Sequence, residues 1–296
     1  MPELPEIALY LHALEQRILG KELQKVRIAS ISLLKTFDPP ASAIEGRAVR
    51  GLRRLGKRIV LDFDDELHAV IHLKIAGRFQ WKARGAPIPK KLGHAAFDFA
   101  DGTLLLTEAG TKKRASLHIV RGEEAVQAQH RGGIEPLEIT EDEFAAALRR
   151  ENRTLKRALT DPRIFSGIGN AHSDEILFEA QLSPTQLTRN LTNEQIHRLY
   201  ECTQTSLRSW MDILISENAD RFPEKVTAFH PRMKVHGRFN QPCVRCGSPV
   251  QRIVFADNET NYCATCQTGG KLLADRALSK LLKDDWPKTL EEMESE

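Results

Sequence analysis

The first six residues of the chain place a secondary amine next to two carboxylic acids. Pro2 follows Met1, and a small penultimate residue normally allows removal of the initiator methionine, which leaves Pro2 as the terminal amine. An α-amino group has a pKa near ~7.7–8.0, and the positive end of a helix beginning at Pro5 would lower it further. Such an amine can attack an electrophilic carbon and form an iminium, as catalytic lysines do. Glu3 and Glu6 would supply acids beside this nucleophile.

The same residues also allow a purely structural interpretation. Pro2 would then be no more than the start of the chain, and Glu3 and Glu6 would be acids that interact favourably with the positive end of a helix. Composition alone favours this interpretation, so a catalytic role for the terminus depends on further motifs.

Two cysteine knuckles form the second chemical motif. Cys243 and Cys246 flank two residues, as do Cys263 and Cys266, and sixteen residues separate the pairs. Four thiolates at this spacing can close tetrahedrally around Zn²⁺, and an ion held by four protein ligands is structural rather than catalytic. The metal would stabilise a module too small to fold alone. Redox-active or unrelated cysteines are the alternative, and Cys202 is interpreted as an ordinary helical thiol.

The hydrophobic pattern of the first 133 residues predicts a helix followed by hairpins. Pro5 and apolar residues at 7, 11, 14 and 18 indicate a helix over 5–19. Apolar runs joined by short turns predict two hairpins, formed by strands 59–63 with 67–73 and 95–100 with 103–107. We therefore expect an N-terminal β-sandwich with a leading helix over 1–133, within an α+β multidomain fold.

Beyond residue 133 the period becomes helical. Helices are expected over 140–150 and 153–160, again after the glycines of the GIGN segment, and after a capping box formed by Thr192 and Gln195. The predicted domains that follow the sandwich are a helical domain at 134–220, a zinc ribbon finger at 232–268 with two strands around an Asp257-Asn258 turn, and a charged helical extension at 269–296.

Composition excludes several classes of protein. The 296 residues are 41% hydrophobic and 28% charged, which suits a globular chain with a buried core. No apolar run reaches the ~18 residues of a membrane span, and the first ten residues do not resemble a secretory signal. Five cysteines are too few for a disulfide scaffold and indicate a reducing compartment. We expect a cytoplasmic protein, associated with the nucleoid if the source is bacterial.

Basic residues gather in three segments, at 50–58, 149–163 and 221–256. The first holds five bases and no acid. Separate basic clusters suit a surface that follows nucleic-acid phosphates, because each neutralised phosphate releases counterions. Any one cluster could equally be ordinary solvated surface.

Four segments in a fixed order carry a family resemblance. They are PELPE at the start, RRLGKRIVL with Lys57, the long segment from TLKRALTDPRIF to GIGNAHSDEILFEA with Lys156 and Asn170, and the two knuckles in VHGRFNQPCVRCG and YCATCQ. Together they resemble the formamidopyrimidine-DNA glycosylase and endonuclease VIII family of base-excision repair enzymes. The resemblance covers residues 1 to about 267. It implies a β-sandwich and a helix–two-turns–helix domain with a DNA cleft between them, followed by a zinc finger.

The resemblance also implies roles for the catalytic residues. Pro2 would attack C1′ of the damaged nucleotide, expel the base and form a Schiff base with the opened sugar. Glu3 would act as general acid and proton shuttle, with Glu6 positioning the site. Lys57 would bind a phosphate and assist the β-elimination that cuts the strand. The target base must leave the helical stack to be reached.

The DNA contacts implied by the resemblance include departures from the family pattern. Asn170 would bind a backbone phosphate beside the flipped nucleotide, and Lys156 is a weaker candidate for the same role. Ile75 occupies the place of a methionine that fills the gap left by the flipped base, and Arg114 lies where an Arg-x-Phe pair is usual. Asn258 replaces an arginine of the finger, which removes a charged bidentate donor.

We therefore expect a bifunctional DNA glycosylase and AP lyase for oxidised bases, acting as a monomer on damaged double-stranded DNA and carrying one structural Zn²⁺. The alternative is a protein on the same scaffold that binds lesions or abasic sites and has lost base excision. A zinc-ribbon adaptor without DNA chemistry would leave the first six residues unexplained.

Overall fold

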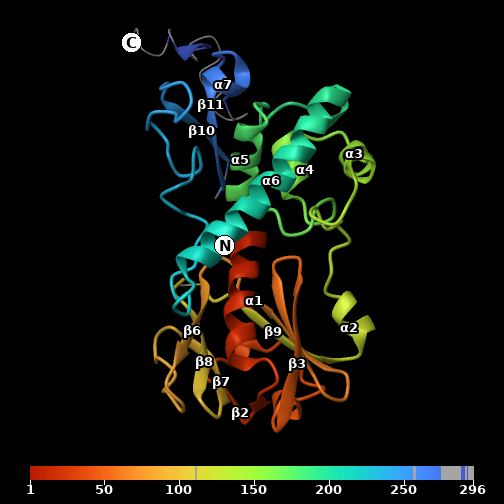
Figure 1. Cartoon of the computed structure of the whole chain (residues 1–296), viewed down its shortest axis with the longest axis vertical. Coiled ribbons are helices and arrows are strands. Elements are labelled where there is room, and N and C mark those ends of the chain that lie inside the picture. Colours follow the sequence, from red (N-terminus) through yellow and green to blue (C-terminus); the bar gives the residue numbers. More distant parts are fainter. Residues whose placement is uncertain (111, 256–257, 275–287, 291, 293–296) are drawn as a thin grey trace. The chain divides into compact units, whose positions relative to one another are not determined.

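The computed structural model describes residues 1–110, 112–255, 258–274, 288–290 and 292, which belong to two compact units. Unit 1 comprises Met1–Gly132 and Ser209–Ala228, and unit 2 comprises Gly133–Arg208 and Phe229–Glu296. Figure 1 labels the elements of both units. Within the helices that the structure describes, no stretch is both long and apolar enough to cross a bilayer.

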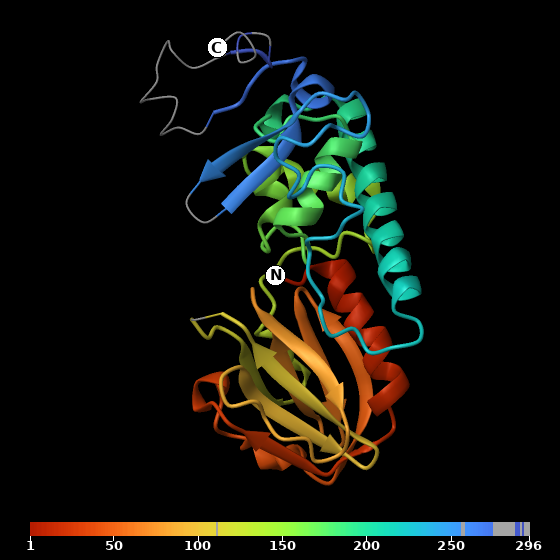
Figure 2. The same cartoon turned by 90° about the vertical axis from the view of Figure 1, so that its left-hand side faces the viewer.

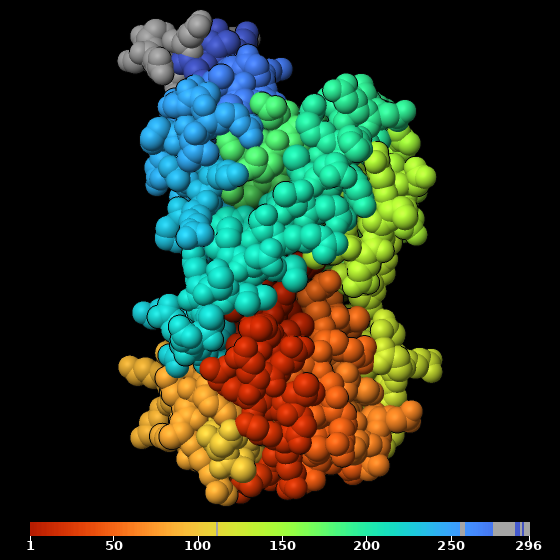
Figure 3. Space-filling model, viewed as in Figure 1, coloured from red at the N-terminus to blue at the C-terminus, as the bar shows by residue number. Residues whose placement is uncertain are grey.

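Unit 1 begins with helix α1 (Leu4–Ile18), which confirms the helix predicted over 5–19. Its first turn carries a proline and a capping box in which Glu3 and Glu6 satisfy each other's backbone amides. Tyr10 and Leu14 lie on its fully buried side. Figure 1 shows α1 in red alongside the strands of unit 1, and in Figure 3 the other side of the helix forms part of the molecular surface.

Two antiparallel sheets form the predicted β-sandwich, and Figure 2 shows their strands in orange and yellow. One sheet has the order β1-β3-β4-β5-β9 and the other β2-β7-β8-β6. The strands are β1 (Glu22–Leu23), β2 (Lys25–Ile28), β3 (Arg47–Leu55), β4 (Arg58–Phe63), β5 (Leu67–His72), β6 (Gly77–Lys82), β7 (Gly93–Phe99), β8 (Gly102–Glu108) and β9 (Ser116–Arg121). Both predicted hairpins, β4–β5 and β7–β8, are present.

Alternation along the strands divides buried residues between two sides of the five-stranded sheet. Ile59 and Leu61 of β4 are fully buried, as expected for the side that faces the sandwich core. Val60 and Val70 point to the opposite face, where they pack with Val126 of helix α2 (Glu123–Gln127). Short 3₁₀ turns η1 (Ile31–Leu33) and η2 (Ala41–Ile44) connect β2 to β3.

The segment Ser209–Ala228 belongs to unit 1, which differs from the predicted domain at 134–220. Aromatic and ionic contacts explain the difference. The ring of Phe222 lies 6.2 Å from that of Tyr10, and the guanidinium of Arg17 lies 5.2 Å from the Phe222 centroid. Lys82 and Glu224 form an ion pair of 2.6 Å. These contacts tie the chain after the long helix to α1 and β6.

Unit 2 combines helices with a zinc-ribbon hairpin. Its elements are α3 (Glu141–Arg149), α4 (Leu155–Thr160), α5 (Asn170–Glu179), η3 (Thr188–Asn190), the first part of α6 (Asn193–Glu217), β10 (Val250–Phe255), β11 (Asn258–Cys263) and α7 (Ala264–Thr268). The capping box at the start of α6 is confirmed, because Gln195 N donates to the Thr192 hydroxyl and Thr192 N donates to the Gln195 side chain.

The finger hairpin agrees with the predicted ribbon, with one difference at its turn. Strands β10 and β11 pair in antiparallel register from Val250↔Cys263 to Phe255↔Asn258. Asn258 therefore opens β11 instead of lying in the turn, and Asp257 falls outside the described residues. Most of the predicted charged helical extension, at 275–287, 291 and 293–296, also falls outside the described residues.

Candidate active site and zinc centre

The start of α1 holds both candidate acids inside the protein. Pro2 is buried, and Glu3 and Glu6 are only 2% and 1% exposed. Glu3 is the residue that caps the helix, and its backbone amide donates a 2.8 Å hydrogen bond to Oε2 of Glu6. Glu6 thereby fixes the backbone of Glu3; its predicted part in positioning the site stays a prediction.

The terminal amine lies in an environment that disfavours its protonated form. Burial is the largest cause that lowers the pKa of the Met1 amine. The negative charges of Glu3 and Glu6 raise this pKa, whereas the positive charges of Arg78 and Lys57 lower it further. Removal of Met1 would move the amine by about 3.8 Å along the chain, within the same group of charges. An amine in this position can act as a nucleophile near neutral pH.

Lys57 reaches this group from a tight hairpin. Leu55 pairs with Arg58, so Gly56 and Lys57 alone connect β3 to β4. Gly56 adopts a φ of +61°, which favours glycine and lets the chain reverse within two residues. The structure thus brings Lys57 into the electrostatic environment of the chain terminus, whereas its phosphate contact stays a prediction.

Arg78 is a member of this group that sequence reasoning missed. It lies in β6, and Nη1 of its guanidinium donates hydrogen bonds to the carbonyls of Gly77 at 2.6 Å and Ile75 at 3.2 Å. These bonds hold the guanidinium where its charge reaches the Met1 amine. A lone arginine in a strand carries no distinctive sequence signal, since its position depends on how α1 packs against the sheets.

Ile75 and Arg114, the two residues expected at the gap left by the flipped base, lie on connections between strands of the sandwich. Ile75, between β5 and β6, is 58% exposed. Arg114, before β9, is also exposed, and its backbone amide donates to both carboxylate oxygens of Glu108 at 3.0 Å. Glu108 is fully buried and contacts His94 Nε2 at 2.9 Å. A buried acid therefore anchors the connection that carries Arg114.

In unit 2, Asn170 and Lys156 already have partners within the protein. Asn170 is the first residue of α5, and its side-chain amide donates to the carbonyl of Glu259 at 2.6 Å. Lys156 Nζ donates to the carbonyl of Asn170 at 2.6 Å and lies 2.5 Å from Oδ1 of Asp174. Asn258 is exposed at the start of β11. Phosphate contacts for these residues stay predictions.

Asp174 joins three elements of unit 2 through one buried carboxylate. Its Oδ2 lies 2.8 Å from His236 Nδ1 and accepts a hydrogen bond from the backbone of Asn261 at 3.1 Å. The adjacent Glu175 accepts three backbone amides, from residues 234, 235 and 236, at 2.8–3.0 Å. Since β11 holds Asn261 and α4 holds Lys156, this network connects the helices to the finger.

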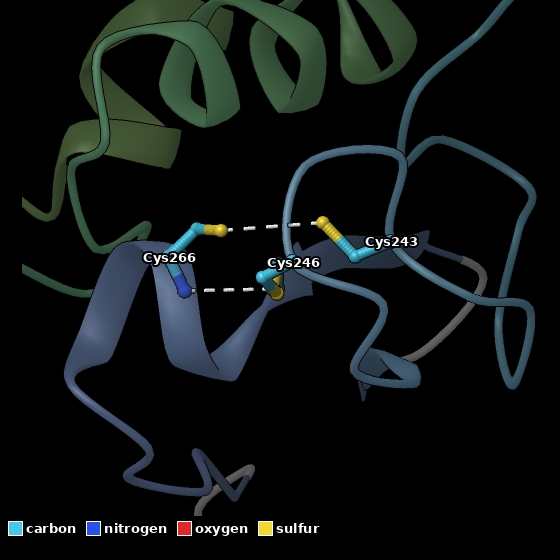
Figure 4. Close-up of side chains that lie close together, drawn as sticks. Cys243, Cys246 and Cys266 are labelled. Carbon is cyan, nitrogen blue, oxygen red and sulfur yellow. Dashed lines mark hydrogen bonds between the residues drawn. The ribbon is translucent and has the colours of Figure 1, made fainter.

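The four knuckle cysteines fit a tetrahedral metal ion. Their sulfur atoms all lie within 4.8 Å of one another, with Cys243 and Cys266 separated by 4.0 Å and Cys246 and Cys263 by 3.4 Å. A tetrahedral zinc ion with Zn–S bonds of ~2.3 Å would hold its sulfurs ~3.8 Å apart. Figure 4 shows the sulfurs of Cys243 and Cys266 directed toward each other.

The electrostatics of the knuckles point to the same ion. Burial raises the pKa of the Cys266 thiol to about 11, so this sulfur can ligate as a thiolate near neutral pH only when a bound cation stabilises its charge. The four sulfur ligands fill every coordination position of a tetrahedral ion and leave no position for a substrate. The finger therefore binds one structural Zn²⁺.

Comparison with known proteins gives the family. Three family models match the chain: the formamidopyrimidine-DNA glycosylase N-terminal domain at residues 1–113, the formamidopyrimidine-DNA glycosylase H2TH domain at 133–213, and a zinc finger found in FPG and IleRS at 240–269. The formamidopyrimidine-DNA glycosylase of Bacillus cereus is 31% identical over 279 residues, which covers 90% of this chain and 99% of that protein. The chain belongs to the formamidopyrimidine-DNA glycosylase family.

Further members of the family match the chain over most of its length. The glycosylase of Desulfitobacterium hafniense is 30% identical and covers 90% of this chain and 100% of its own. The crystal structure of Lactococcus lactis Fpg with DNA containing an oxidised pyrimidine has a TM-score of 0.80, 25% identity, and coverage of 90% and 100%. The L. lactis enzyme with Fapy-dG DNA gives a TM-score of 0.79. These findings confirm the family resemblance and the predicted fold class.

Proposed function

We propose that this member of the formamidopyrimidine-DNA glycosylase family is a base-excision repair glycosylase with AP lyase activity toward oxidised bases. The observation that supports it best is that Pro2, Glu3 and Glu6 lie buried at the start of α1, with the backbone amide of Glu3 bonded to Glu6. Glu3, Glu6 and Lys57, each expected from sequence, also shift the pKa of the Met1 amine. Its partner is damaged double-stranded DNA. We further propose that it acts as a monomer in the cytoplasm, associated with the nucleoid in a bacterium.

The first chemical step uses the amine of Pro2, once Met1 is removed. Its lone pair forms a bond to C1′ of the flipped nucleotide while the bond from C1′ to the base breaks, and the base leaves with that electron pair. The nitrogen then loses its proton, which the departing base takes up, and forms a double bond to C1′ while the bond from C1′ to O4′ breaks. Glu3 protonates O4′ as the sugar ring opens, since it lies beside the terminus and is buried. The product is a Schiff base between Pro2 and C1′.

The second step cuts the DNA strand. Loss of a proton from C2′ of the Schiff base expels the 3′ phosphate by β-elimination. Lys57 would neutralise charge on a phosphate during this step, because an ammonium is a compact donor for phosphate oxygens. In unit 2, Asn170 would contact a backbone phosphate, with Lys156 holding the carbonyl of Asn170 in place. Water would then release Pro2 for another cycle.

A second candidate function is recognition of a lesion or abasic site without base excision. The connection that follows β8 favours it, because Lys112, Lys113 and Arg114 offer three positive charges with no aromatic ring to fill the base gap. Ile75 and Asn258 replace larger or charged groups of the family pattern. Intact Pro2 and Glu3 favour the enzyme.

Borohydride trapping separates the two functions. The protein is incubated with duplex DNA that carries 8-oxoguanine or an abasic site, and borohydride then reduces any Schiff base to a stable covalent adduct. We expect an adduct with both substrates, loss of the adduct when the amino terminus is chemically blocked, and base excision ~10²–10⁴-fold slower in Glu3→Gln. The exposed Lys25→Gln serves as the control. Tight binding with no adduct on either DNA would refute the enzymatic function.

A further inference from the structure

The chain returns to the finger after its last described helix. Helix α7 is followed by Gly269 and Gly270, whose φ values of +64° and +88° belong to the left-handed region that glycine tolerates best. The chain reverses there and brings Leu273 back to Tyr262 of β11. The Tyr262 hydroxyl accepts a 2.7 Å hydrogen bond from the Leu273 amide.

A segment from near the end of the chain pairs with this returning stretch. Lys271 and Thr289 form an antiparallel bridge, and the amide of Leu272 donates to the carbonyl of Lys288 at 2.9 Å. The next residue, Leu290, packs against the same apolar group as Leu272. Backbone pairing and side-chain packing therefore both attach this segment to the finger.

Residues 288–290, which we call the C-terminal strap, cover an apolar cluster of the finger. The family model of the finger ends at residue 269, so the strap lies outside the part of the chain that this model matches. A zinc ribbon is too small to bury much apolar surface by itself, so packing by the strap adds to its stability. The buried members of the cluster are Tyr262, Ala264 and Leu272, and its partly buried members are Ile253, Leu273 and Leu290.

The covered tyrosine adjoins the second cysteine knuckle. Tyr262 directly precedes the ligand Cys263, whose amide donates to Oε1 of Gln267 at 2.9 Å. Gln267 in turn donates to the carbonyl of Leu182 at 2.9 Å. A structural ion leaves its site when part of that site opens locally. Opening of the second knuckle would have to move Tyr262 from beneath the strap.

We propose that the C-terminal strap holds the second knuckle closed and slows the loss of Zn²⁺ from the finger. The strap acts through apolar packing and backbone pairing, because the four ligands of the ion all lie in the knuckles. The proposal concerns retention of the metal alone, so it stands or falls independently of the proposed glycosylase activity.

Release of zinc to a chelator tests the proposal. Zinc-loaded protein is mixed with 4-(2-pyridylazo)resorcinol at concentrations where the rate no longer depends on the chelator, and absorbance of the zinc complex gives the release rate. Leu290→Ala removes a partly buried side chain of the strap. We expect release to be ~5–10-fold faster, because about half of the transfer free energy of a buried leucine is lost.

The matched control is Val254→Ala, which shortens an aliphatic side chain of the same finger. Val254 lies in β10, is 42% exposed and is outside the apolar cluster. We expect its release rate to stay within ~2-fold of that of the unaltered protein, as is usual for surface substitutions.

Two further variants keep the proposal testable. Tyr262→Phe keeps the ring but removes the acceptor of the Leu273 amide, and we expect zinc release ~2–5-fold faster. A chain ending at residue 287 should release zinc at least as fast as Leu290→Ala. Should the shortened chain not fold, the two point variants decide the outcome.

Hydrogen exchange locates the effect within the protein. In Leu290→Ala the amide of Cys263 should exchange faster, whereas the amides of β4 and β5 in unit 1 should keep their rates. Release rates of Leu290→Ala and Tyr262→Phe equal to that of Val254→Ala would overturn the proposal. Equal acceleration of exchange in both units would also overturn it, because the strap would then act on global stability and not on the knuckle.

Discussion

The buried carboxylate of Asp174 offers a sharp test of how the finger is attached to the helices. The change is Asp174→Asn, which keeps the shape of the side chain and removes its charge. Asp174 is 1% exposed, and Lys156, its partner at 2.5 Å, is 9% exposed. The substitution leaves the ammonium of Lys156 buried without its counter-charge and weakens the contact with His236.

The expected cost follows from that geometry. Removing one partner of a buried ion pair destabilises a protein by ~3–5 kcal/mol, because the remaining charge stays in a poorly solvated place. A domain of this size loses ~2–4 °C of Tm per kcal/mol, so the transition of unit 2 should fall by ~6–20 °C. The double variant Lys156→Met with Asp174→Asn should recover part of the loss, since no charge then remains buried.

Thermal unfolding followed by calorimetry is the assay, with zinc-loaded protein throughout. Glu201→Gln is the control, because Glu201 is an exposed acid in the part of α6 that belongs to unit 2. We expect its Tm to match that of the unaltered protein. A Tm for Asp174→Asn within ~1 °C of the unaltered protein, or a double variant less stable than the single one, would refute this reasoning.

Three further predictions concern zinc, pH and the base gap. Cys246→Ser should lose zinc and DNA affinity together, measured by metal analysis and by titration with abasic-site DNA; unchanged affinity in zinc-free protein would exclude the finger from binding. Burial lowers the pKa of His72 to about 2, with further contributions from the cations Lys74, Arg58, Lys57 and Arg131. His72 therefore stays neutral in the folded protein, whereas the unfolded chain binds a proton there below pH ~6.5, so the free energy of unfolding decreases as pH falls. Denaturant unfolding should show that the free energy of unfolding decreases by ~2 kcal/mol from pH 7 to pH 5 in the unaltered protein, and that this decrease is absent in His72→Gln. Ile75→Ala should weaken binding to abasic-site DNA more than to undamaged duplex; equal losses would contradict a base-gap role.

Local signals were enough to predict the first helix of unit 1 and two of its hairpins. The apolar spacing and Pro5 predicted α1, and the Asp101-Gly102 turn predicted the β7–β8 hairpin, because both depend on residues close in sequence. The zinc site followed for the same reason, since each knuckle presents its two thiols locally. The family resemblance then indicated which groups would meet at the terminus.

Long-range packing accounts for what the sequence did not reveal. The periodicity of α6 predicted one helix but could not show that its last residues belong with α1, a placement that depends on Phe222 and Glu224. Arg78 reaches the terminus only through the pairing of strands and the packing of α1. The bonds of Asp174 join residues up to 87 positions apart, a distance over which no sequence period carries information.

The most direct measurement of the central claim identifies the atom that holds the DNA after reduction. Borohydride-trapped complex made with abasic-site duplex is digested with nuclease and protease, and its peptides are sequenced by mass spectrometry. We expect the sugar remnant on a peptide that begins at Pro2, with Met1 absent and the remnant attached to the proline nitrogen. A remnant on Lys57 or another lysine, or strand cleavage by protein that keeps Met1, would contradict the account.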